Sequence, residues 1–374
     1  MSGLYIHVPF CASICSYCHF ARTADHGRAD RERFVRGVVR ELALRRAACP
    51  VLGAGERRLE TAYLGGGTPS QLEPDLAELL IAGTVGTLPL ADDLEFTAEA
   101  NPESLTDAVA RTWRALGVGR VSLGVQSLDP GVLKLLGRAC DPATARAAID
   151  RAVRRFPRVS ADWILGPGLD RPRLLAELKE AVDRGVEHVS LYILELHPGT
   201  ALEARVRAKE VALLPDRRTE SLYLSCVEEL ARLGLVQYEV SNFARPGAES
   251  RHNAGYWRRR PWLALGPAAH GAWGRRRYAN AGTLAAWLGK LDLGQIPEAS
   301  VDPLDTAARR LERVVLALRT RQGVPLAWLP PGALDLPAGR REGLWQVADG
   351  SLRLLPRGFL RIDTVEARLA RVLG

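Results

Sequence analysis

The chain has 374 residues, of which 47% are hydrophobic and 25% are charged, a composition typical of a soluble globular protein. No apolar run approaches the length of a membrane-spanning helix, so a cytoplasmic location is predicted. The net charge of +8 favours an acidic partner, such as nucleic acid, an anionic membrane surface or a ligand with carboxylates or phosphates. The sequence contains no zinc finger or RNA-binding signature, so nucleic acid is not expected as the partner.

An apolar stretch at residues 4–8 is predicted to be a strand, and three closely spaced cysteines follow it at once. Cys11, Cys15 and Cys18 form a CxxxCxxC pattern on one short segment. Cysteine thiolates are the usual ligands of iron–sulfur clusters, and a [4Fe–4S] cluster normally takes four of them. Three thiolates would leave one iron open to another ligand, as catalytic metal sites leave a position free.

Two other uses of these cysteines are weaker. A disulfide framework suits a small secreted chain, whereas this chain is long and begins without a signal peptide. A zinc site needs a fourth ligand, and His19 directly follows Cys18, which is too close for an easy tetrahedral arrangement. The other cysteines, Cys49, Cys140 and Cys226, are isolated and are expected to be small buried side chains.

Short apolar runs alternate with longer amphipathic stretches through the first half of the chain. Helices are predicted at residues 31–46 and 105–116, the second with Ser104 and Asp107 as a capping box. Alternation of strands and helices predicts a parallel sheet. Six units are too few for a closed eight-stranded barrel, so the expected fold class is α/β, a partial (β/α)6 TIM-like barrel. The predicted strands are residues 4–8, 60–64, 94–98, 120–125, 158–164 and 188–194.

Unusual residues fall at the ends of these predicted strands. The sequence GGGTPS of residues 65–70 follows the second strand, and Glu99 and Gln126 lie at the ends of the third and fourth. Asp162 lies towards the end of the fifth, and Tyr192 near the end of the sixth. Active sites of parallel barrels gather at the carboxyl ends of the strands. We therefore expect these residues and the cysteine loop to share one rim.

The pattern changes beyond residue 200. An amphipathic helix is predicted at residues 217–233, a connector at 290–305, and a small β-hairpin from strands at 351–355 and 359–362. Between them the sequence HNAGYW occupies residues 252–257. We expect a barrel, an extension that carries HNAGYW and a smaller α+β domain that resembles a winged helix, at residues 1–230, 231–295 and 296–374.

Together these features resemble the radical S-adenosylmethionine (SAM) superfamily. Within it, the chain is similar to the branch that contains the HemW haem chaperones and the oxygen-independent coproporphyrinogen dehydrogenases. The resemblance implies that Cys11, Cys15 and Cys18 bind a [4Fe–4S] cluster whose open iron is chelated by SAM, and that one electron from the cluster can cleave SAM. The SAM contacts that it implies are Tyr5, Gly66, Gly67, Thr68, Glu99, Gln126, Arg138 and Asp162.

Three features favour the HemW family over the dehydrogenases. Phe20 stands where the dehydrogenases carry a further cysteine, and the first strand starts too near residue 1 for the extension that shapes their substrate site. HNAGYW matches the HNxxYW motif of HemW proteins, which implicates His252 in holding haem, with Arg258, Arg259 and Arg260 beside the propionates. Without the resemblance, the favoured interpretation is a histidine that caps a turn beside two core aromatics, with the arginines on a solvated face.

The implied function is that of a haem chaperone that binds a [4Fe–4S] cluster, SAM and haem and delivers haem to apo-haemoproteins such as cytochromes. No residue is assigned a catalytic role. The alternatives are anaerobic coproporphyrinogen dehydrogenation and another radical SAM reaction such as methyl transfer. The resemblance is also compatible with a homodimer and with peripheral association with a membrane.

Overall fold

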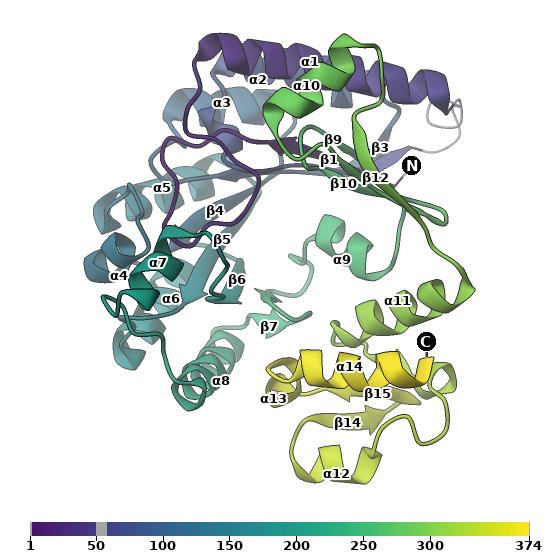
Figure 1. Ribbon diagram of the computed structural model, residues 1–374. Helices are drawn as coiled ribbons and strands as arrows, with labels where there is room; N and C mark the ends of the chain where they lie inside the picture. The colour runs from purple at the N-terminus through teal and green to yellow at the C-terminus, as the bar shows by residue number, and fades with distance from the viewer. Residues whose placement is uncertain (1, 50–57, 374) are drawn as a thin grey trace.

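The computed structural model describes residues 2–49 and 58–373, and a curved sheet of twelve strands forms its centre (Figure 1). The strand order is β12-β11-β10-β9-β1-β2-β3-β4-β5-β6-β8-β7. Each of the six predicted strands is confirmed, and neighbours in the series β1 to β6 pair in parallel. They are β1 (Gly3–Val8), β2 (Leu59–Gly66), β3 (Leu90–Ala100), β4 (Arg120–Gln126), β5 (Arg158–Leu165) and β6 (His188–Ile193).

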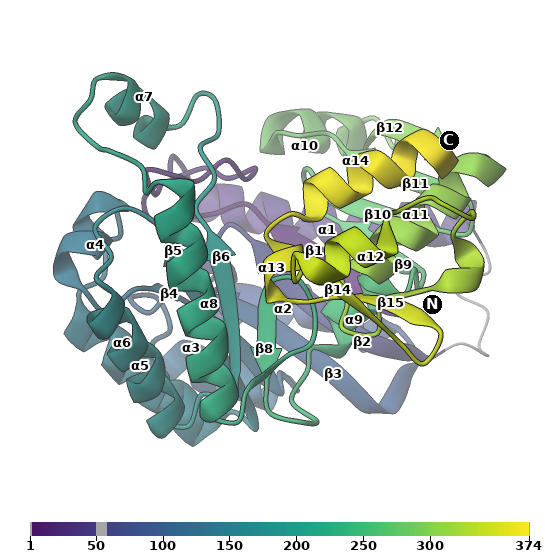
Figure 2. The same ribbon diagram turned by 90° about the horizontal axis from the view of Figure 1, so that it is seen from below.

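Helices cover the outer face of this parallel sheet, as the alternating sequence pattern predicts (Figures 1 and 2). The predicted helix at residues 31–46 lies within α1, where Phe34 and Val38 are fully buried. The predicted helix at 217–233 corresponds to α8. The helices are α1 (Arg28–Ala48), α2 (Pro74–Gly83), α3 (Asp107–Ala115), α4 (Pro130–Leu135), α5 (Pro142–Arg155), α6 (Arg171–Asp183), α7 (Ala201–Arg207) and α8 (Asp216–Arg232).

The capping box predicted at Ser104 is wrong. Helix α3 begins at Asp107, and its N-cap is Thr106, whose side chain accepts a hydrogen bond from Val109 N at 3.2 Å. The Ser104 hydroxyl instead forms a 2.6 Å hydrogen bond with Ser70 Oγ. Two hydroxyl residues close together could each start the helix, and the contact with Ser70 removes Ser104 from that role.

Strands that the sequence did not predict extend the sheet at both edges. On one side β9 (Trp262–Leu265) pairs in parallel with β1, and three antiparallel strands follow it. The connector expected at 290–305 is therefore wrong, because it contains a strand of this sheet. The added elements are β7 (Val236–Gln237), β8 (Asn242–Ala244), α9 (Arg251–Trp257), β10 (His270–Trp273), β11 (Arg276–Asn280), α10 (Leu284–Asp292) and β12 (Glu298–Pro303).

The C-terminal segment has its own hydrophobic core, which includes Val314, Trp345 and Leu369. A three-stranded sheet of order β13-β15-β14 packs there with four helices (Figure 1). The predicted hairpin is half wrong, because the partner of the strand at 351–355 precedes it, and residues 359–362 form the end of one helix, a turn and the start of the next. The elements are α11 (Thr306–Leu318), β13 (Val324–Pro325), α12 (Leu336–Arg341), β14 (Trp345–Ala348), β15 (Ser351–Leu354), α13 (Pro356–Phe359) and α14 (Ile362–Leu373).

The division of the chain at residues 230 and 295 stays a prediction. Strand β12, which follows the second boundary directly, pairs with β11 of the large sheet, while the separate core begins in α11. No helix in the two described ranges is long and apolar enough to cross a membrane.

Candidate functional site

The three cysteines lie on the loop that joins β1 to α1, beyond the carboxyl end of β1 (Figure 2). A backbone hydrogen bond of 3.0 Å from Cys11 N to Thr23 O closes this loop on itself. Helix α7 lies beside it, and Leu202 N donates to Ser16 O at 2.8 Å. All three thiols are free and partly exposed. The loop thus holds three sulfur ligands where an incoming molecule can reach them.

Two of the sulfur atoms receive hydrogen bonds from neighbouring parts of the rim. Thr68 Oγ1 donates to Cys11 Sγ at 3.4 Å, and Arg138 Nη1 donates to Cys15 Sγ at the same distance. Burial raises the pKa of the Cys11 and Cys18 thiols above its usual value. A bound metal reverses this effect, because its positive charge holds coordinating thiols in the deprotonated form.

The glycine turn after β2 is pressed against the start of the cysteine loop. Gly66 has φ +111°, and a Cβ at this position would lie 2.6 Å from the His7 ring. A Cβ at Gly67 would lie 2.8 Å from the carbonyl carbon of Pro9. Gly67 N also donates to Val8 O at 2.7 Å. Only glycine permits this close approach of two backbones.

Two acidic side chains lie inside the barrel near this turn. Glu99 accepts hydrogen bonds from Tyr63 OH at 2.7 Å and from Gly66 N at 3.1 Å, and Asp162 accepts one from Ser122 Oγ at 3.2 Å. Burial raises the pKa of Glu99 to about 7, and the nearby Asp162 carboxyl adds to this shift. Burial also raises the pKa of Asp162 to about 6. Both carboxyls have acceptor capacity left for the hydroxyls of a ligand.

Arg138 and Gln126 form the next part of the rim. The Arg138 side chain is 4% exposed, and its Nη2 donates to Asn101 Oδ1 at 3.0 Å and to Gly124 O at 2.6 Å. Gln126 ends β4 with φ +70°, a strained conformation for a residue other than glycine. Gln126 Oε1, Arg138 Nε and Glu103 Oε2 are buried and have no hydrogen-bond partner in the described part of the chain, although Glu103 Oε2 lies 4.0 Å from Arg138 Nη2. Strain and unpaired polar atoms together mark a place where a polar ligand would complete the hydrogen bonding.

Tyr5 lies below the glycine turn. Its hydroxyl donates to His7 Nδ1 at 3.1 Å, and His7 Nε2 donates to Ala21 O at 2.7 Å. The Tyr5 ring is also 6.0 Å from the ring of Tyr63, which holds Glu99. In this arrangement Tyr5 orients His7, the residue that Gly66 contacts, and the contact of Tyr5 with SAM stays a prediction.

His252 is deeply buried in α9. Its side chain is 3% exposed, its Nδ1 is 2.8 Å from Thr61 Oγ1, and its Nε2 is 2.7 Å from Tyr256 OH. The ring stacks on Tyr63 at 5.0 Å, and burial lowers its pKa to about 3. Both ring nitrogens therefore have protein partners in this conformation, as a buried structural histidine would.

Helix α9 separates the two halves of the expected haem site. His252 and Tyr256 lie on the side that packs against the first residues of β1 and β2. Trp257 and Arg258 line a cavity on the other side. Arg260 lines the small pocket beside His252 as well as this cavity, whereas His252 does not line the cavity that contains Arg258 and Arg259.

The residues at the rim fit a [4Fe–4S] cluster with a polar co-ligand. Three thiols lie on one loop. Beside it, buried atoms of Gln126, Arg138 and Glu103 have no hydrogen-bond partner among the described residues; these residues lie at the end of β4, after α4 and after β3 respectively. Within residues 2–49 and 58–373, no three His, Cys, Asp or Glu side chains converge on a position for a single metal ion. A cubic cluster needs no such convergence, because separate irons take separate thiolates.

Comparison with known proteins agrees with this geometry. A model described as the radical SAM superfamily matches residues 5–181. The haem chaperone HemW of Mycobacterium tuberculosis is 38% identical over 368 residues, which cover 97% of this chain and 93% of that protein. HemW of Bacillus subtilis is 30% identical over 327 residues, which cover 87% and 85%. The chain belongs to the HemW family.

A solved structure confirms the fold expected for a HemW relative. Coproporphyrinogen III oxidase (HemN) from Escherichia coli, a radical SAM enzyme, superposes with a TM-score of 0.82 over 99% of this chain and 90% of that one. Its sequence is 19% identical, so this likeness shows the fold alone. The α/β fold class with a central parallel sheet is thereby confirmed.

Two rim residues received no role in the sequence analysis. Asn101 Nδ2 donates to Thr68 Oγ1 at 3.2 Å and thus connects the end of β3 to the partner of Cys11. Asn101 follows Glu99 by two residues, so its place after a strand was a usable signal. Tyr63, which holds Glu99, lies within β2, and nothing in the local sequence distinguishes it from a core aromatic.

Proposed function

We propose that this chain is a haem chaperone that binds a [4Fe–4S] cluster, SAM and haem and delivers haem to apo-haemoproteins such as cytochromes. The observation that carries the proposal is the presence of the cysteine loop and the HNxxYW sequence in one chain of the HemW family. Relatives that align over most of the chain are named haem chaperones.

In this proposal Cys11, Cys15 and Cys18 hold the cluster, which supplies one-electron chemistry towards SAM when it is bound. The protein contributes positioning. The hydrogen bonds from Thr68 and Arg138 to cysteine sulfur stabilise negative charge on the ligands. Further proposed SAM contacts are Tyr5, Gly66, Gly67, Glu99, Gln126 and Asp162.

His252 is the proposed ligand of haem iron. Its low pKa keeps the imidazole neutral at physiological pH, which is the form that binds metals. Because Nε2 is within 2.7 Å of Tyr256 OH, ligation requires the ring to exchange this tyrosine for iron. The proposal therefore includes a rotation of the His252 or Tyr256 side chain when haem binds, because both residues lie on α9 and a movement of the whole helix would not separate them.

Phe20 bears on the choice between chaperone and dehydrogenase. It stands where the dehydrogenases carry a further cysteine, and its side chain is 55% exposed near the cysteine loop. An exposed phenylalanine supplies neither a thiol nor a proton. We therefore propose no coproporphyrinogen dehydrogenase activity.

The test starts from protein reconstituted anaerobically with iron and sulfide. Haem is titrated and the Soret band recorded, and transfer to an apo-cytochrome is then followed, with parallel assays for 5′-deoxyadenosine and porphyrin products. We expect haem binding and transfer, and His252→Ala should weaken the Soret band while His270→Ala, at an exposed position, should not. Circular dichroism checks that both variants fold. Formation of protoporphyrinogen from coproporphyrinogen would contradict the proposed chaperone function and support dehydrogenase activity instead.

A further inference from the structure

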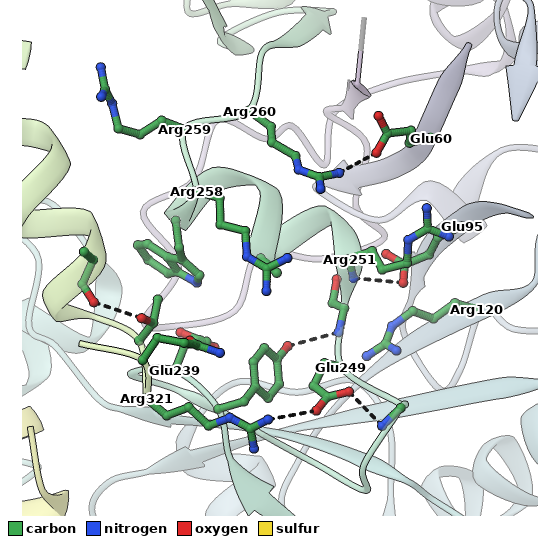
Figure 3. Close-up of a pocket in the computed structure, with 18 of the residues that line it drawn as sticks. Glu60, Glu95, Arg120, Glu239, Glu249, Arg251, Arg258, Arg259, Arg260 and Arg321 are labelled. Atoms are coloured by element: carbon green, nitrogen blue, oxygen red, sulfur yellow. Dashed lines mark hydrogen bonds and ion pairs between the residues drawn. The ribbon is translucent and has the colours of Figure 1, made fainter. Parts of the chain in front are cut away.

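A cavity of about 1090 Å³ lies between the amino-terminal ends of the central strands, α9 and the C-terminal domain (Figure 3). It is at the opposite end of the sheet from the cysteine loop. Strand β4 shows the separation, since Arg120 at its start lines the cavity and Gln126 at its end belongs to the rim. At roughly 3.3 Å per residue these two positions are about 20 Å apart.

The cavity carries more positive charge than its own carboxylates neutralise. Eight arginines line it, and five of them form ion pairs with acidic residues. Arg120, Arg258 and Arg313 have no carboxylate within 4.0 Å in the described part of the chain. The paired arginines are Arg158, Arg251, Arg259, Arg260 and Arg321, with Glu187, Asp93, Glu312, Glu60 and Glu249 respectively.

Arg120 is the clearest sign of an unfilled site. It is 3% exposed, and its Nη1 donates to a neutral group, Ala248 O, at 2.9 Å. The Asp162 carboxyl acts on Arg120 only from beyond ion-pair distance. A buried cation without an ion-pair partner is unfavourable by several kcal/mol, so an anionic ligand at this position would stabilise it. Glu239, on the same wall, is 1% exposed and its Oε1 has no partner among the described residues. Burial raises the pKa of Glu239 to about 7, so this carboxyl is a weak counter-ion and a usable donor.

Aromatic side chains supply the apolar part of the cavity. Trp257 and Trp328 both line it, and the Arg313 guanidinium lies 4.0 Å from the centre of the Trp328 ring. Trp257 Nε1 is buried without a partner in the described chain. The volume is at the upper end of the range for pockets that bind small molecules. A ligand that fills this space must be large, apolar in its body and anionic at more than one point.

We propose that this cavity binds a tetrapyrrole through its two propionates, without an axial ligand to the metal. This inference rests on the proposed function, which makes a tetrapyrrole the ligand. Arg258 and Arg120 reach into the cavity from different walls, whereas Arg260 turns to Glu60 (Figure 3).

No histidine, cysteine or methionine is among the described residues that line the cavity. Tyr238 also lines it, but its hydroxyl is already hydrogen-bonded to His188 Nε2 at 2.9 Å and to Ser250 N at 3.2 Å. Recognition therefore depends on the carboxylates and the flat ring, and iron is not required.

The test compares haem, iron-free protoporphyrin IX and the dimethyl ester of protoporphyrin, with binding followed by quenching of tryptophan fluorescence. We expect haem and protoporphyrin to bind with dissociation constants within about threefold of each other, and the ester at least tenfold more weakly. The double variant Arg258→Gln, Arg313→Gln should weaken binding of both acids at least tenfold. Both side chains lack ion pairs, so folding should be retained, and Arg309→Gln on the same helix as Arg313 is the matched control.

Each other outcome separates this inference from the chaperone proposal. Unchanged protoporphyrin affinity in the double variant, or release of bound protoporphyrin by equimolar tripolyphosphate, would overturn the inference. Binding of haem but not of protoporphyrin would also overturn the inference about the cavity. It would remain compatible with the chaperone function and with His252 as the iron ligand. A third result is that haem and protoporphyrin both bind in a way that depends on the arginines while haem is not transferred to an apo-cytochrome. This result would support a tetrapyrrole site in the cavity and overturn the proposed chaperone function.

Discussion

Replacement of Gly67 by alanine should displace the cysteine loop and reduce cluster binding. The added Cβ would lie 2.8 Å from the carbonyl carbon of Pro9 and 2.9 Å from both Phe10 O and Val8 O. Non-bonded heavy atoms normally stay about 3.5 Å or more from a carbon atom, so these backbone atoms must move by about 0.6 Å or more from the added Cβ. No flexible side chain can absorb this movement, because every close atom belongs to the backbone.

The expected penalty follows from these contacts. Overpacking of this kind typically costs about 1–3 kcal/mol. The displaced atoms directly precede Cys11, so the strain acts on the first cluster ligand and on the 2.7 Å hydrogen bond from Gly67 N to Val8 O. If about 1.4 kcal/mol of the penalty falls on the loaded state, the affinity for cluster or for SAM decreases about tenfold.

The measurement is iron and sulfide per chain after anaerobic reconstitution, followed by SAM titration of the loaded fraction. Gly289→Ala is the matched control, because a Cβ there meets no atom within 4 Å and the residue lies inside α10. This control should bind as much iron as the unmodified chain and unfold at equal or slightly higher urea. Full iron content and unchanged SAM affinity in Gly67→Ala would refute the reasoning about the turn.

Three further predictions concern stability. Arg45→Met should lower the free energy of unfolding by about 3–5 kcal/mol in urea, because it leaves Glu41 fully buried without its 2.8 Å partner. The contribution of Glu99 to the free energy of unfolding should fall as pH rises from 4.5 to about 7, because the folded state holds a proton on Glu99 that the unfolded chain has lost. Over this range the stability of the unmodified chain should therefore fall by about 2 kcal/mol relative to that of Glu99→Gln. Thr106→Ala should cost about 1 kcal/mol, because Val109 N loses its cap in α3.

Each of these predictions has a control. Arg46→Met, next to Arg45 but on the exposed side of α1, should change the urea midpoint little, and an equal loss would contradict the role of the buried pair. An unchanged pH profile in Glu99→Gln would place the bound proton elsewhere, for example on Asp162, whose pKa is also raised. For α3, Ser104→Ala tests the cap that the sequence favoured, and a larger loss there than in Thr106→Ala would contradict the observed start of the helix.

The strands of the parallel sheet could be predicted because each contains a short, mainly apolar run that alternates with a longer helical pattern. The rim followed from them, since Glu99 and Gln126 end strands whose carboxyl ends meet at one edge. Strands β9 to β12 could not be predicted in this way, because β9, β10 and β11 have only four or five residues and because β11 and β12 carry charged side chains. Their place in the sheet depends on pairing with distant segments and not on local pattern.

The sequence predicted the surroundings of individual side chains less well than it predicted the fold. The motif HNAGYW gives no sign that His252 is turned inward, since that depends on Thr61 of β2, which is far away in sequence. The cavity lined by arginines is likewise formed by the starts of strands, by α9 and by the C-terminal domain, so no single stretch of sequence predicts it. The sequence drew attention only to the three adjacent arginines that follow α9, Arg258, Arg259 and Arg260, and the last two form ion pairs.

Helix α9 is only seven residues long, and it is the wall between the barrel interior and the arginine cavity. A two-turn helix moves as one rigid piece, so a rotation that releases His252 from Thr61 of β2 also carries Trp257 and Arg258 with it. Thermodynamic linkage then requires reciprocity. If occupancy of the cavity shifts α9, it alters affinity for a ligand on the barrel side by the same factor with which that ligand alters affinity in the cavity.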